Sequence, residues 1–517
     1  MESALISALK DPARYPHDVD DISVMETHIS WIILTGSHAY KIKKPLDLGF
    51  LDFRELEARR FYCQEELRLN RRLADDVYEA VVPITGGSDR PILGGSGTPF
   101  EYALRMRQFD PNRTLDKLCE RDELTKEQLD ELAERVADFH QSVPALSPED
   151  PLADLSNLRQ AMLDNFSTIL EKVENDSERN RCASLRGWTE SWFDQLEPRI
   201  RQRLDAGLFR ECHGDLHLGN IASFEGRVTV FDCIEFNESL RWIDPANDLA
   251  FLLMDLESRD RRALAYRVLN HYLEQNGDYN ALAFMGLYKA YRAMVRAKIT
   301  LLLPAEDAQA RDRIGERFRT YTGLAEHYSR IPAPWLAITT GFSASGKSRI
   351  SARLAEHFGM IQIRSDVERK RLFNLTPNQS SRSQVDGGIY TPEATRQTYG
   401  RLRTLTREAL MAGFPVIVDC AALRREERKS LHEVAESLGL PALLVSCEAP
   451  EETLRERIRE RVRHRNEVSE ATEAILEQQF ANAEPLLDSE QTHTVHINTD
   501  NPESLELLIQ AIEKHTV

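Results

Sequence analysis

The stretch GFSASGKS, residues 341–348, decides the fold of the C-terminal part of this 517-residue chain. It fits the pattern G-x-x-x-x-G-K-[ST], and it stands between the apolar run WLAITT (335–340) and the helix-favouring run RISARLAEHFG (349–359). In such a strand–loop–helix unit, backbone N–H groups at the start of the helix point at phosphate oxygens. The alternative is a glycine- and serine-rich turn that only happens to precede a helix. The sequence therefore predicts a phosphate-binding loop.

The residue types of this loop suit ATP and Mg²⁺ as ligands. Glycine permits unusual backbone dihedrals and a close approach of the backbone to phosphate. Lys347 is expected to neutralise charge on the β- and γ-phosphates, and Ser348 to ligate Mg²⁺. The predicted nucleotide contacts of the loop are Gly341, Ser343, Ala344, Ser345, Gly346, Lys347, Ser348 and Arg349.

Two further apolar runs of this part end in carboxylates. MIQIRSD (360–366) ends at Asp366, which we expect to take the proton of an attacking hydroxyl; the alternative is a helix N-cap. FPVIVDCA (414–421) contains Asp419, which suits a carboxylate held near Mg²⁺; the alternative is a plain strand-ending turn residue. Alternation of strands and helices predicts a parallel sheet covered by helices.

An arginine-rich helix is expected near the C-terminus, in LRERIRERVRHRNEVSEA (454–471). The planar fork of arginine suits phosphate, so one or two of these residues would close over ATP as a lid. Arg457 and Arg461 are the predicted lid residues, and the other arginines are expected to pair with Glu456 and Glu460.

The N-terminal part carries a second constellation, in CHGDLHLGNI (212–221) and RVTVFDCIEFN (227–237). Its spacing matches the H-R-D-x-x-x-x-N loop of protein kinases. Asp215 is the predicted base for an acceptor hydroxyl, and Asn220 and Asp232 are the predicted metal ligands, because Mg²⁺ takes hard oxygen ligands. A β-hairpin joining the loop to Asp232 would bring the three side chains together. The alternative is a polar loop with an ordinary turn asparagine and a strand-ending aspartate.

These motifs resemble two known families. Through HGDLHLGN, VFDCIEFN and WIDPANDLAFLLMDL (242–256), residues 25–325 resemble the aminoglycoside phosphotransferase family, in which an aspartate equivalent to Asp248 braces the catalytic loop. Residues 335–517 resemble the small P-loop kinases: gluconate kinase, the kinase domain of polynucleotide kinase and zeta-toxin-like kinases. The whole chain, including YKIKKPLDLGFLDF (40–53), looks like a bacterial fusion of an aminoglycoside-phosphotransferase-like domain with a P-loop, AAA-type ATPase.

The first resemblance implies a strand lysine that grips the nucleotide and pairs with a helix glutamate. HAYKIKK (38–44) offers three lysines, of which Lys41 and Lys43 point the same way because strand residues alternate faces. Aligning YKIK with the kinase motif V-A-I-K favours Lys43, with Glu65 or Glu66 as its partner, of which we assign Glu66. A solvated strand end is the alternative. The sequence contains no G-x-G-x-x-G loop.

The predicted fold is an α+β bilobal kinase-like domain followed by an α/β P-loop domain with a parallel sheet. We place the first domain at 1–328, with a small lobe at about 25–107 and a helical large lobe at about 108–328, and the second at 335–517, after the proline-containing YSRIPAPW. Seven scattered cysteines without CxxC, no secretory signal and no membrane-spanning run favour the cytoplasm.

The predicted function is a bifunctional ATP-dependent phosphotransferase that uses ATP and Mg²⁺ in both halves. Its expected partners are small molecules with hydroxyl acceptors, sugar-like or aminocyclitol-like, with no membrane partner. The formal net charge of −18 argues against a large nucleic-acid surface. Two alternatives stay open: a nucleotide-sensing regulatory ATPase with one weak kinase half, and a nucleic-acid 5′-end kinase.

Overall fold

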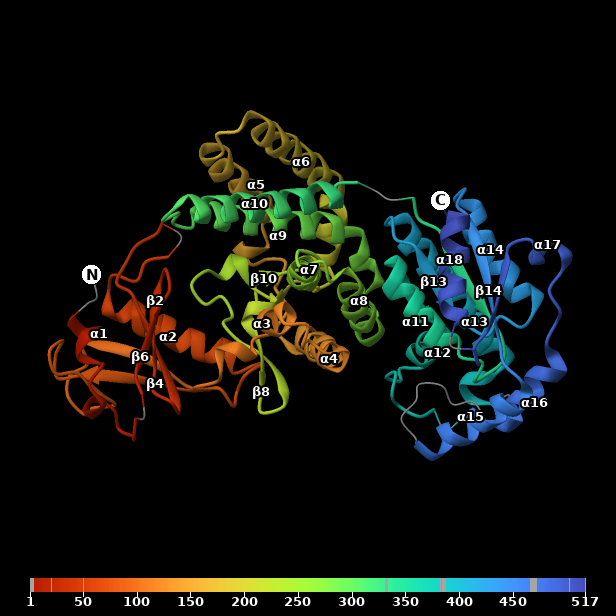
Figure 1. The fold of residues 1–517 in the computed structure, drawn as a ribbon, viewed down its shortest axis with the longest axis horizontal. Helices are drawn as coiled ribbons and strands as arrows, with labels where there is room; N and C mark the ends of the chain where they lie inside the picture. The colour runs from red at the N-terminus through yellow and green to blue at the C-terminus, as the bar shows by residue number, and fades with distance from the viewer. Residues whose placement is uncertain are drawn as a thin grey trace. The chain divides into compact units, whose positions relative to one another are not determined.

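The computed structural model describes residues 4–19, 21–49, 51–330, 333–381, 383, 387–464, 472–501 and 503–516 (Figure 1). The chain divides into two compact units, one of Met1–Glu131 with Phe139–Asp255 and one of Leu132–Asp138 with Leu256–Val517. No helix of the described ranges is long and apolar enough to cross a membrane.

The first unit opens with a six-stranded antiparallel sheet. Its strands, in spatial order, are β1 (Ser23–Glu26), β2 (Ser30–Leu34), β3 (His38–Lys43), β6 (Glu101–Arg107), β4 (Tyr78–Thr85) and β5 (Ile92–Leu93). Helix α2 (Leu56–Asn70) packs against β4 and β6. Ile33, Tyr40 and Ile42 form the core on the other face with Ile6 of α1 (Ala4–Ala8). Alternation of side chains along β3 therefore places Lys41 and Lys43 on the α2 side.

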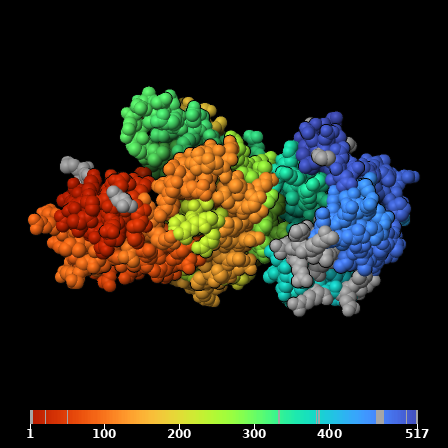
Figure 2. Space-filling model, turned by 60° about the horizontal axis from the view of Figure 1, so that its bottom comes forward, coloured from red at the N-terminus to blue at the C-terminus, as the bar shows by residue number. Residues whose placement is uncertain are grey.

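Helices and a small hairpin complete the first unit. The helices are α3 (Leu115–Glu120), α5 (Leu155–Lys172) and α6 (Asp176–Asp205), together with most of α4 (Lys126–Ser142) and α7 (Pro245–Glu257). The middle of α4 and the end of α7 are assigned to the second unit. The predicted hairpin is present, as β8 (Ile221–Phe224) and β9 (Arg227–Val230). Its yellow-green tip reaches the surface among orange segments in Figure 2. Strands β7 (Arg210–Glu211) and β10 (Trp242–Ile243) form a two-stranded sheet. The predicted catalytic loop and the hairpin lie between these two strands in the sequence.

The second unit contains a five-stranded, fully parallel sheet. Its spatial order is β12 (Ile361–Arg364), β13 (Val416–Asp419), β11 (Leu336–Thr340), β14 (Ala442–Glu448) and β15 (Thr494–Asn498). All five residues of β11 are buried, as expected for a strand covered on both faces. The strand order reverses beside β11, and ligands of open α/β sheets bind at the carboxyl ends of strands at such a point.

The helices that follow along this domain are α11 (Lys347–Phe358), α12 (Ser365–Leu372), α13 (Pro392–Met411), α14 (Arg425–Ser437), α15 (Glu451–His464), α16 (Glu473–Asn482), α17 (Asp488–Gln491) and α18 (Ser504–Thr516). Of these, α11, α12, α13, α14, α17 and α18 pack against strands of the sheet. Three more helices belong to the same unit: α8 (Arg262–Asn276), α9 (Leu282–Leu302) and α10 (Ala308–Tyr328). Side chains of Trp335, Leu354, Ile417 and Val445 form the core beside the phosphate-binding loop.

The predicted fold class is confirmed: a kinase-like α+β domain with an antiparallel sheet precedes an α/β domain with a parallel sheet. The predicted domain limits, 1–328 and 335–517, remain predictions. The compact units divide the chain near residue 255, because α8 packs against α11 and β12 of the parallel-sheet domain.

Candidate active sites

The phosphate-binding loop is built as its sequence predicts, between β11 and α11. Gly341 has φ of +146°, and a Cβ there would lie 2.4 Å from the carbonyl oxygen of Cys447. Gly346 has φ of +84° and directly precedes α11, which begins at Lys347. Both positions require glycine, since a side chain would clash in the first case and strain the backbone in both.

Polar groups of the loop region point inward. The ammonium of Lys347 donates to the carbonyl oxygens of Gly341 (2.9 Å) and Phe342 (2.6 Å). Burial lowers the pKa of Lys347, and the nearby Asp419 carboxylate partly opposes this shift. The backbone N–H of Ser343 donates to Oε1 of Gln479 at 2.8 Å. This cationic cradle fits a polyphosphate, whose oxygens would accept hydrogen bonds from the same lysine and N–H groups.

Asp419 is the last residue of β13, the strand beside β11. Burial raises the pKa of its carboxyl, while Arg364, 3.5 Å away, and a hydrogen bond from Ser348 oppose the shift. A hydroxyl and a carboxylate placed in this way are hard oxygen donors that suit Mg²⁺. Glu274 on α8 holds Arg364 from the other side at 2.6 Å.

Asp366 lies in a helix and not, as the sequence pattern suggests, at the end of a strand. Strand β12 ends at Arg364, and Asp366 belongs to the first turn of α12. The N-cap residue is Arg364, so the alternative role of Asp366 as the N-cap does not hold. A cavity of about 620 Å³ nevertheless brings Asp366 together with Lys347, Ser348 and Asp419. Of the other predicted loop contacts, the cavity is lined by Ser343, Ala344, Gly346 and Arg349, but not by Gly341 or Ser345.

The predicted lid arginines lie differently from the expectation. Arg457 donates to the carbonyl oxygen of Ala344 (3.2 Å) and to Asp500 (2.7 Å), so it braces the back of the loop and does not line the cavity. The side chain of Arg461 lies outside the described residues. Arg455 pairs with Glu451 and Glu477, and Arg459 pairs with Glu473, which corrects the predicted pairing for these two arginines. The side chains of Arg463 and Arg465 also lie outside the described residues.

In the first unit, the predicted catalytic loop brings Asp215 and Asn220 into contact. The Asn220 amide donates to Oδ2 of Asp215 at 2.9 Å, and the Asp215 side chain is about one-third exposed. The carbonyl oxygen of Asn220 accepts from the N–H of Phe231 at 2.9 Å, which places Asp232 beside the loop. Asp232 has φ of +63° and a side chain that is 44% exposed. The hairpin therefore joins the three predicted groups as expected.

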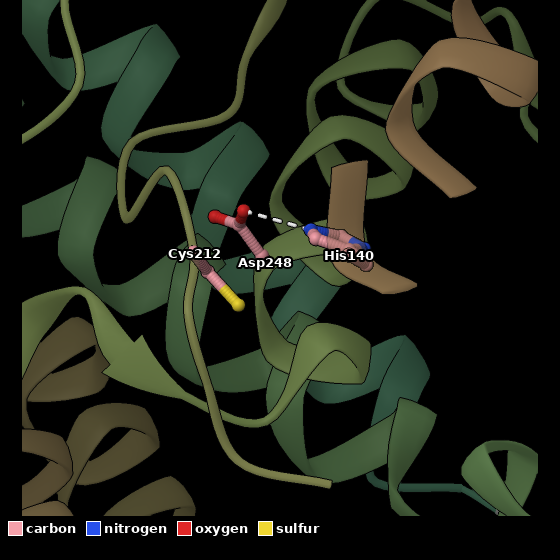
Figure 3. A group of neighbouring side chains, drawn as sticks. All are labelled: His140, Cys212 and Asp248. Carbon is pink, nitrogen blue, oxygen red and sulfur yellow. Dashed lines mark hydrogen bonds and ion pairs between the residues drawn. The ribbon is translucent and has the colours of Figure 1, made fainter. Parts of the chain in front are cut away.

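A buried cluster behind the loop holds it in place (Figure 3). Asp248 accepts the N–H groups of His213 and Gly214, both at 2.9 Å, and contacts Nε2 of His140 at 3.1 Å. Cys212 completes a group of metal-type donors with His140 and Asp248. Since both oxygens of Asp248 already accept hydrogen bonds from the loop, the cluster serves as a brace. The sequence predicted the role of Asp248 but not that of His140.

The two strand lysines share one glutamate. Lys41 contacts Oε1 of Glu66 at 2.6 Å, and Lys43 contacts Oε2 at 2.7 Å. Burial favours the neutral form of Glu66, but the two ammonium groups outweigh it and lower its pKa to about 2. Burial acts against the charge of Lys41 too, yet Asp232 and Glu66 raise its pKa well above the usual value. Glu66, rather than Glu65, is therefore the partner, and Glu65 pairs with Arg68.

The lysines differ in what else they touch. Lys41 contacts Oδ1 of Asp232 at 2.6 Å, beside the predicted metal position. Lys43 is 1% exposed, pairs with the buried Glu235 and lies 5.0 Å from the Phe53 ring centre. Lys41 is therefore the lysine at the site, and Lys43, which the motif comparison favoured, lies beneath it. No sequence signal separates the two, because both share one face of β3.

Sequence reasoning missed two other groups at this site. Nδ1 of His217 accepts from the N–H of Gly219, so the proton is on Nε2, which lies 3.4 Å from Oδ2 of Asp215. The hydroxyl of Tyr78 accepts from the N–H of Asp232 at 3.2 Å. Each holds a predicted catalytic or metal-binding aspartate in place.

Comparisons with known proteins agree with both halves. Residues 55–285 match the phosphotransferase enzyme family, and residues 336–486 match the AAA domain family. An uncharacterized Mycobacterium tuberculosis protein, Rv2004c, is 26% identical over 445 residues, which cover 86% of this chain and 87% of that protein. A gluconokinase from Sinorhizobium meliloti is similar over 36% of this chain and 99% of its own (21% identity, TM-score 0.26). An amicoumacin kinase is similar over 60% and 89% (15% identity, TM-score 0.38).

The two matched families, taken with the sites, define the class of the protein: it is an ATP-dependent kinase. More particularly, one chain combines a region that matches the phosphotransferase enzyme family with a P-loop region that matches the AAA domain family. The family resemblance predicted from the sequence is thereby confirmed.

Proposed function

We propose that the chain is a bifunctional phosphotransferase with an ATP and Mg²⁺ site in each half, and that each half phosphorylates a hydroxyl group of a small, sugar-like or aminocyclitol-like molecule. The observation that carries the proposal is the cavity of about 620 Å³ in which Lys347, Ser348, Asp366 and Asp419 converge. Its volume suits a small ligand bound against the phosphate-binding loop.

In the P-loop half, the acceptor hydroxyl oxygen attacks the γ-phosphorus, and the bond from that phosphorus to the bridging oxygen breaks to release ADP. Asp366 takes the hydroxyl proton. Lys347 and the loop N–H groups bind the phosphates and stabilise their charge. Ser348 and Asp419 would hold Mg²⁺, which neutralises charge on the phosphates when bound.

In the kinase-like half, Asp215 takes the acceptor proton. Asn220 and Asp232 would hold the metal ion, and Lys41, held by Glu66, contacts the phosphates. The hydrogen bond from Asn220 to Asp215 (2.9 Å) links the base to the metal-binding side. Positioning and charge stabilisation supply most of the rate in both halves.

A nucleotide-sensing role for the kinase-like half is the second candidate, and two observations favour it. The turn between β1 and β2 is only residues 27–29 and contains no glycine. The tight turn at Thr35 and Gly36 is occupied too, because both N–H groups donate to Oε1 of Gln108 at 2.9 Å. The first turn lacks glycine, and the N–H groups of Thr35 and Gly36 in the second are already engaged, so this half would bind ATP weakly.

Transfer of labelled γ-phosphate from ATP to a metabolite library tests the proposal, with wild type, Asp215→Ala and Lys347→Ala compared. Two sets of products are expected, each lost in one variant. Nucleotide binding without transfer in the Lys347→Ala protein would favour the sensing role, and products only from oligonucleotides would favour a 5′-end kinase. The seven free, buried cysteines support action in the cytoplasm.

A further inference from the structure

The far end of the P-loop cavity, away from the phosphate-binding loop, is formed by α12, α13 and α14. Thr395, Tyr399 and Arg403 follow each other at four-residue intervals on α13 and line it together. Asp366 and Arg369 line it from α12, three residues apart. The proposed base therefore lies on the same helix face as an arginine of this end, so an acceptor that reaches Asp366 also meets these residues.

This cavity is far more cationic than the chain as a whole. Its lining contains six arginines and one lysine against four carboxylates: Arg349, Arg364, Arg369, Arg396, Arg403, Arg424 and Lys347 against Asp366, Asp419, Glu426 and Glu427. The chain carries a net charge of −18. Burial also raises the pKa of the Glu427 carboxyl, which disfavours its negative charge. ATP and Mg²⁺ account for Lys347 and the loop, but not for the arginines of α12 and α13.

Arg369 is a buried cation at this end whose hydrogen-bonding capacity is only partly used. Its side chain is 9% exposed, and its Nη1 donates to the carbonyl oxygen of Ile389 (3.0 Å) and the hydroxyl of Thr395 (3.3 Å). Its buried Nε has no hydrogen-bond partner among the described residues, and its guanidinium lies 5.2 Å from the Tyr390 ring centre. A buried guanidinium that is not fully hydrogen-bonded is costly. An anionic ligand in the cavity would satisfy it.

Arg403 is the second cation at this end of the cavity. It is exposed to the cavity, and within the described ranges it forms no ion pair. The other cavity arginine of α13, Arg396, is instead engaged by Glu393. Two planar guanidinium groups around one cavity suit the oxygens of a phosphate or carboxylate, which accept paired hydrogen bonds.

We propose that the P-loop half phosphorylates a hydroxyl of a small molecule that already carries a phosphate monoester or a carboxylate, and that Arg369 and Arg403 bind this anion. The inference rests on the proposed function of this half. It also places the half in a reaction sequence: its substrate is supplied by a reaction that phosphorylates a hydroxyl or forms a sugar acid. Phosphorylation of a hydroxyl is the chemistry proposed for the kinase-like half of the same chain.

The test uses the full chain with Asp215→Asn, which silences the kinase-like half. Initial rates are measured with ATP and matched acceptors: neutral polyols, their monophosphates and the corresponding sugar acids. We expect kcat/KM to be at least about 10²-fold higher for an anionic member, because two guanidinium groups would form charge-assisted hydrogen bonds with its anion. Preference for monophosphates or for acids identifies the source of the anion. Equal use of neutral and anionic acceptors, or activity on oligonucleotides alone, overturns the proposal.

Arg403→Gln and Arg369→Gln are expected to raise KM for the anionic acceptor about 10–100-fold and to leave KM for ATP unchanged. Arg403 is exposed, so its variant folds even where loss of the buried Arg369 disturbs the protein. The control is Arg407→Gln, on the same helix but hydrogen-bonded to Ser437 outside the cavity. An Arg403→Gln protein with unchanged KM for the anionic acceptor contradicts the proposal. If no acceptor gives Lys347-dependent transfer, the proposed function itself fails, which is a separate outcome.

Discussion

Replacing Glu66 by glutamine tests the shared carboxylate of the kinase-like half. Glu66 is fully buried and holds two lysines at 2.6 and 2.7 Å. Removing one partner of a buried ion pair costs about 3–5 kcal/mol. Because Lys41 keeps Asp232 and Lys43 keeps Glu235, we expect the lower end, about 3 kcal/mol of local stability.

The stability lost on replacing Glu66 by glutamine also depends on pH, in a direction fixed by the pKa of Glu66. Its folded-state pKa is lowered to about 2 from an ordinary 4.5, so its carboxylate stabilises the folded state above pH 4.5. That contribution is lost as pH falls from 4.5 towards about 2. The difference in stability between wild type and Glu66→Gln is therefore largest at neutral pH and shrinks below pH 4.5.

Native-state hydrogen exchange of the β3 amides measures the free energy of local unfolding around β3. The measurement is separate from the stability of the P-loop half. The matched control is Glu65→Gln, one residue earlier on α2; its near partner Arg68 is nearly half exposed, and Arg241 is more distant at 3.8 Å. That surface pair contributes about 0–1 kcal/mol. If Glu66→Gln costs no more than Glu65→Gln, or if its cost is unchanged between pH 7 and pH 3, the shared buried carboxylate does not support this lobe.

Three further outcomes are expected. Lys41→Met should abolish ATP use by the kinase-like half and cost less stability in urea unfolding than Lys43→Met, because Glu66 keeps Lys43 and Asp232 is partly exposed. Lys43→Met should lower stability by about 3 kcal/mol because it leaves Glu235 buried without its lysine. The reverse pattern would restore Lys43 as the nucleotide lysine. Asp215→Ala should reduce turnover of that half by about 10²–10⁴-fold with little change in ATP binding, and unchanged turnover in a steady-state assay would exclude it as the base. Gly341→Ala should abolish nucleotide binding by the P-loop half in an equilibrium titration, because its Cβ would lie 2.4 Å from the Cys447 carbonyl oxygen, and tight binding would mean that the loop relaxes.

The sequence predicted the elements that local patterns control. The glycines of residues 341–348, the apolar run before them and the helix after them define one strand–loop–helix unit, and it forms as expected. The interval from Asp215 to Asn220 and the hairpin to Asp232 are likewise short-range features. These groups are close along the chain, so the loop and the hairpin that join them also bring them together in space.

Features that depend on tertiary contacts were not predictable. Lys41 and Lys43 are equivalent by alternation, and only the packing of Asp232 and Glu235 distinguishes them. His140 is 108 residues from Asp248, so no local pattern links the two. The cavity arginines of α12 and α13 carry no motif, and their common lining depends on how three helices pack.

Equilibrium titration of the full chain with a non-hydrolysable ATP analogue and Mg²⁺ counts the nucleotide sites directly. Two bound nucleotides per chain are expected for wild type, one for Lys347→Ala, one for Asp232→Asn and none for the double variant. A single bound nucleotide in wild type, lost entirely in Lys347→Ala, would show that only the P-loop half binds ATP.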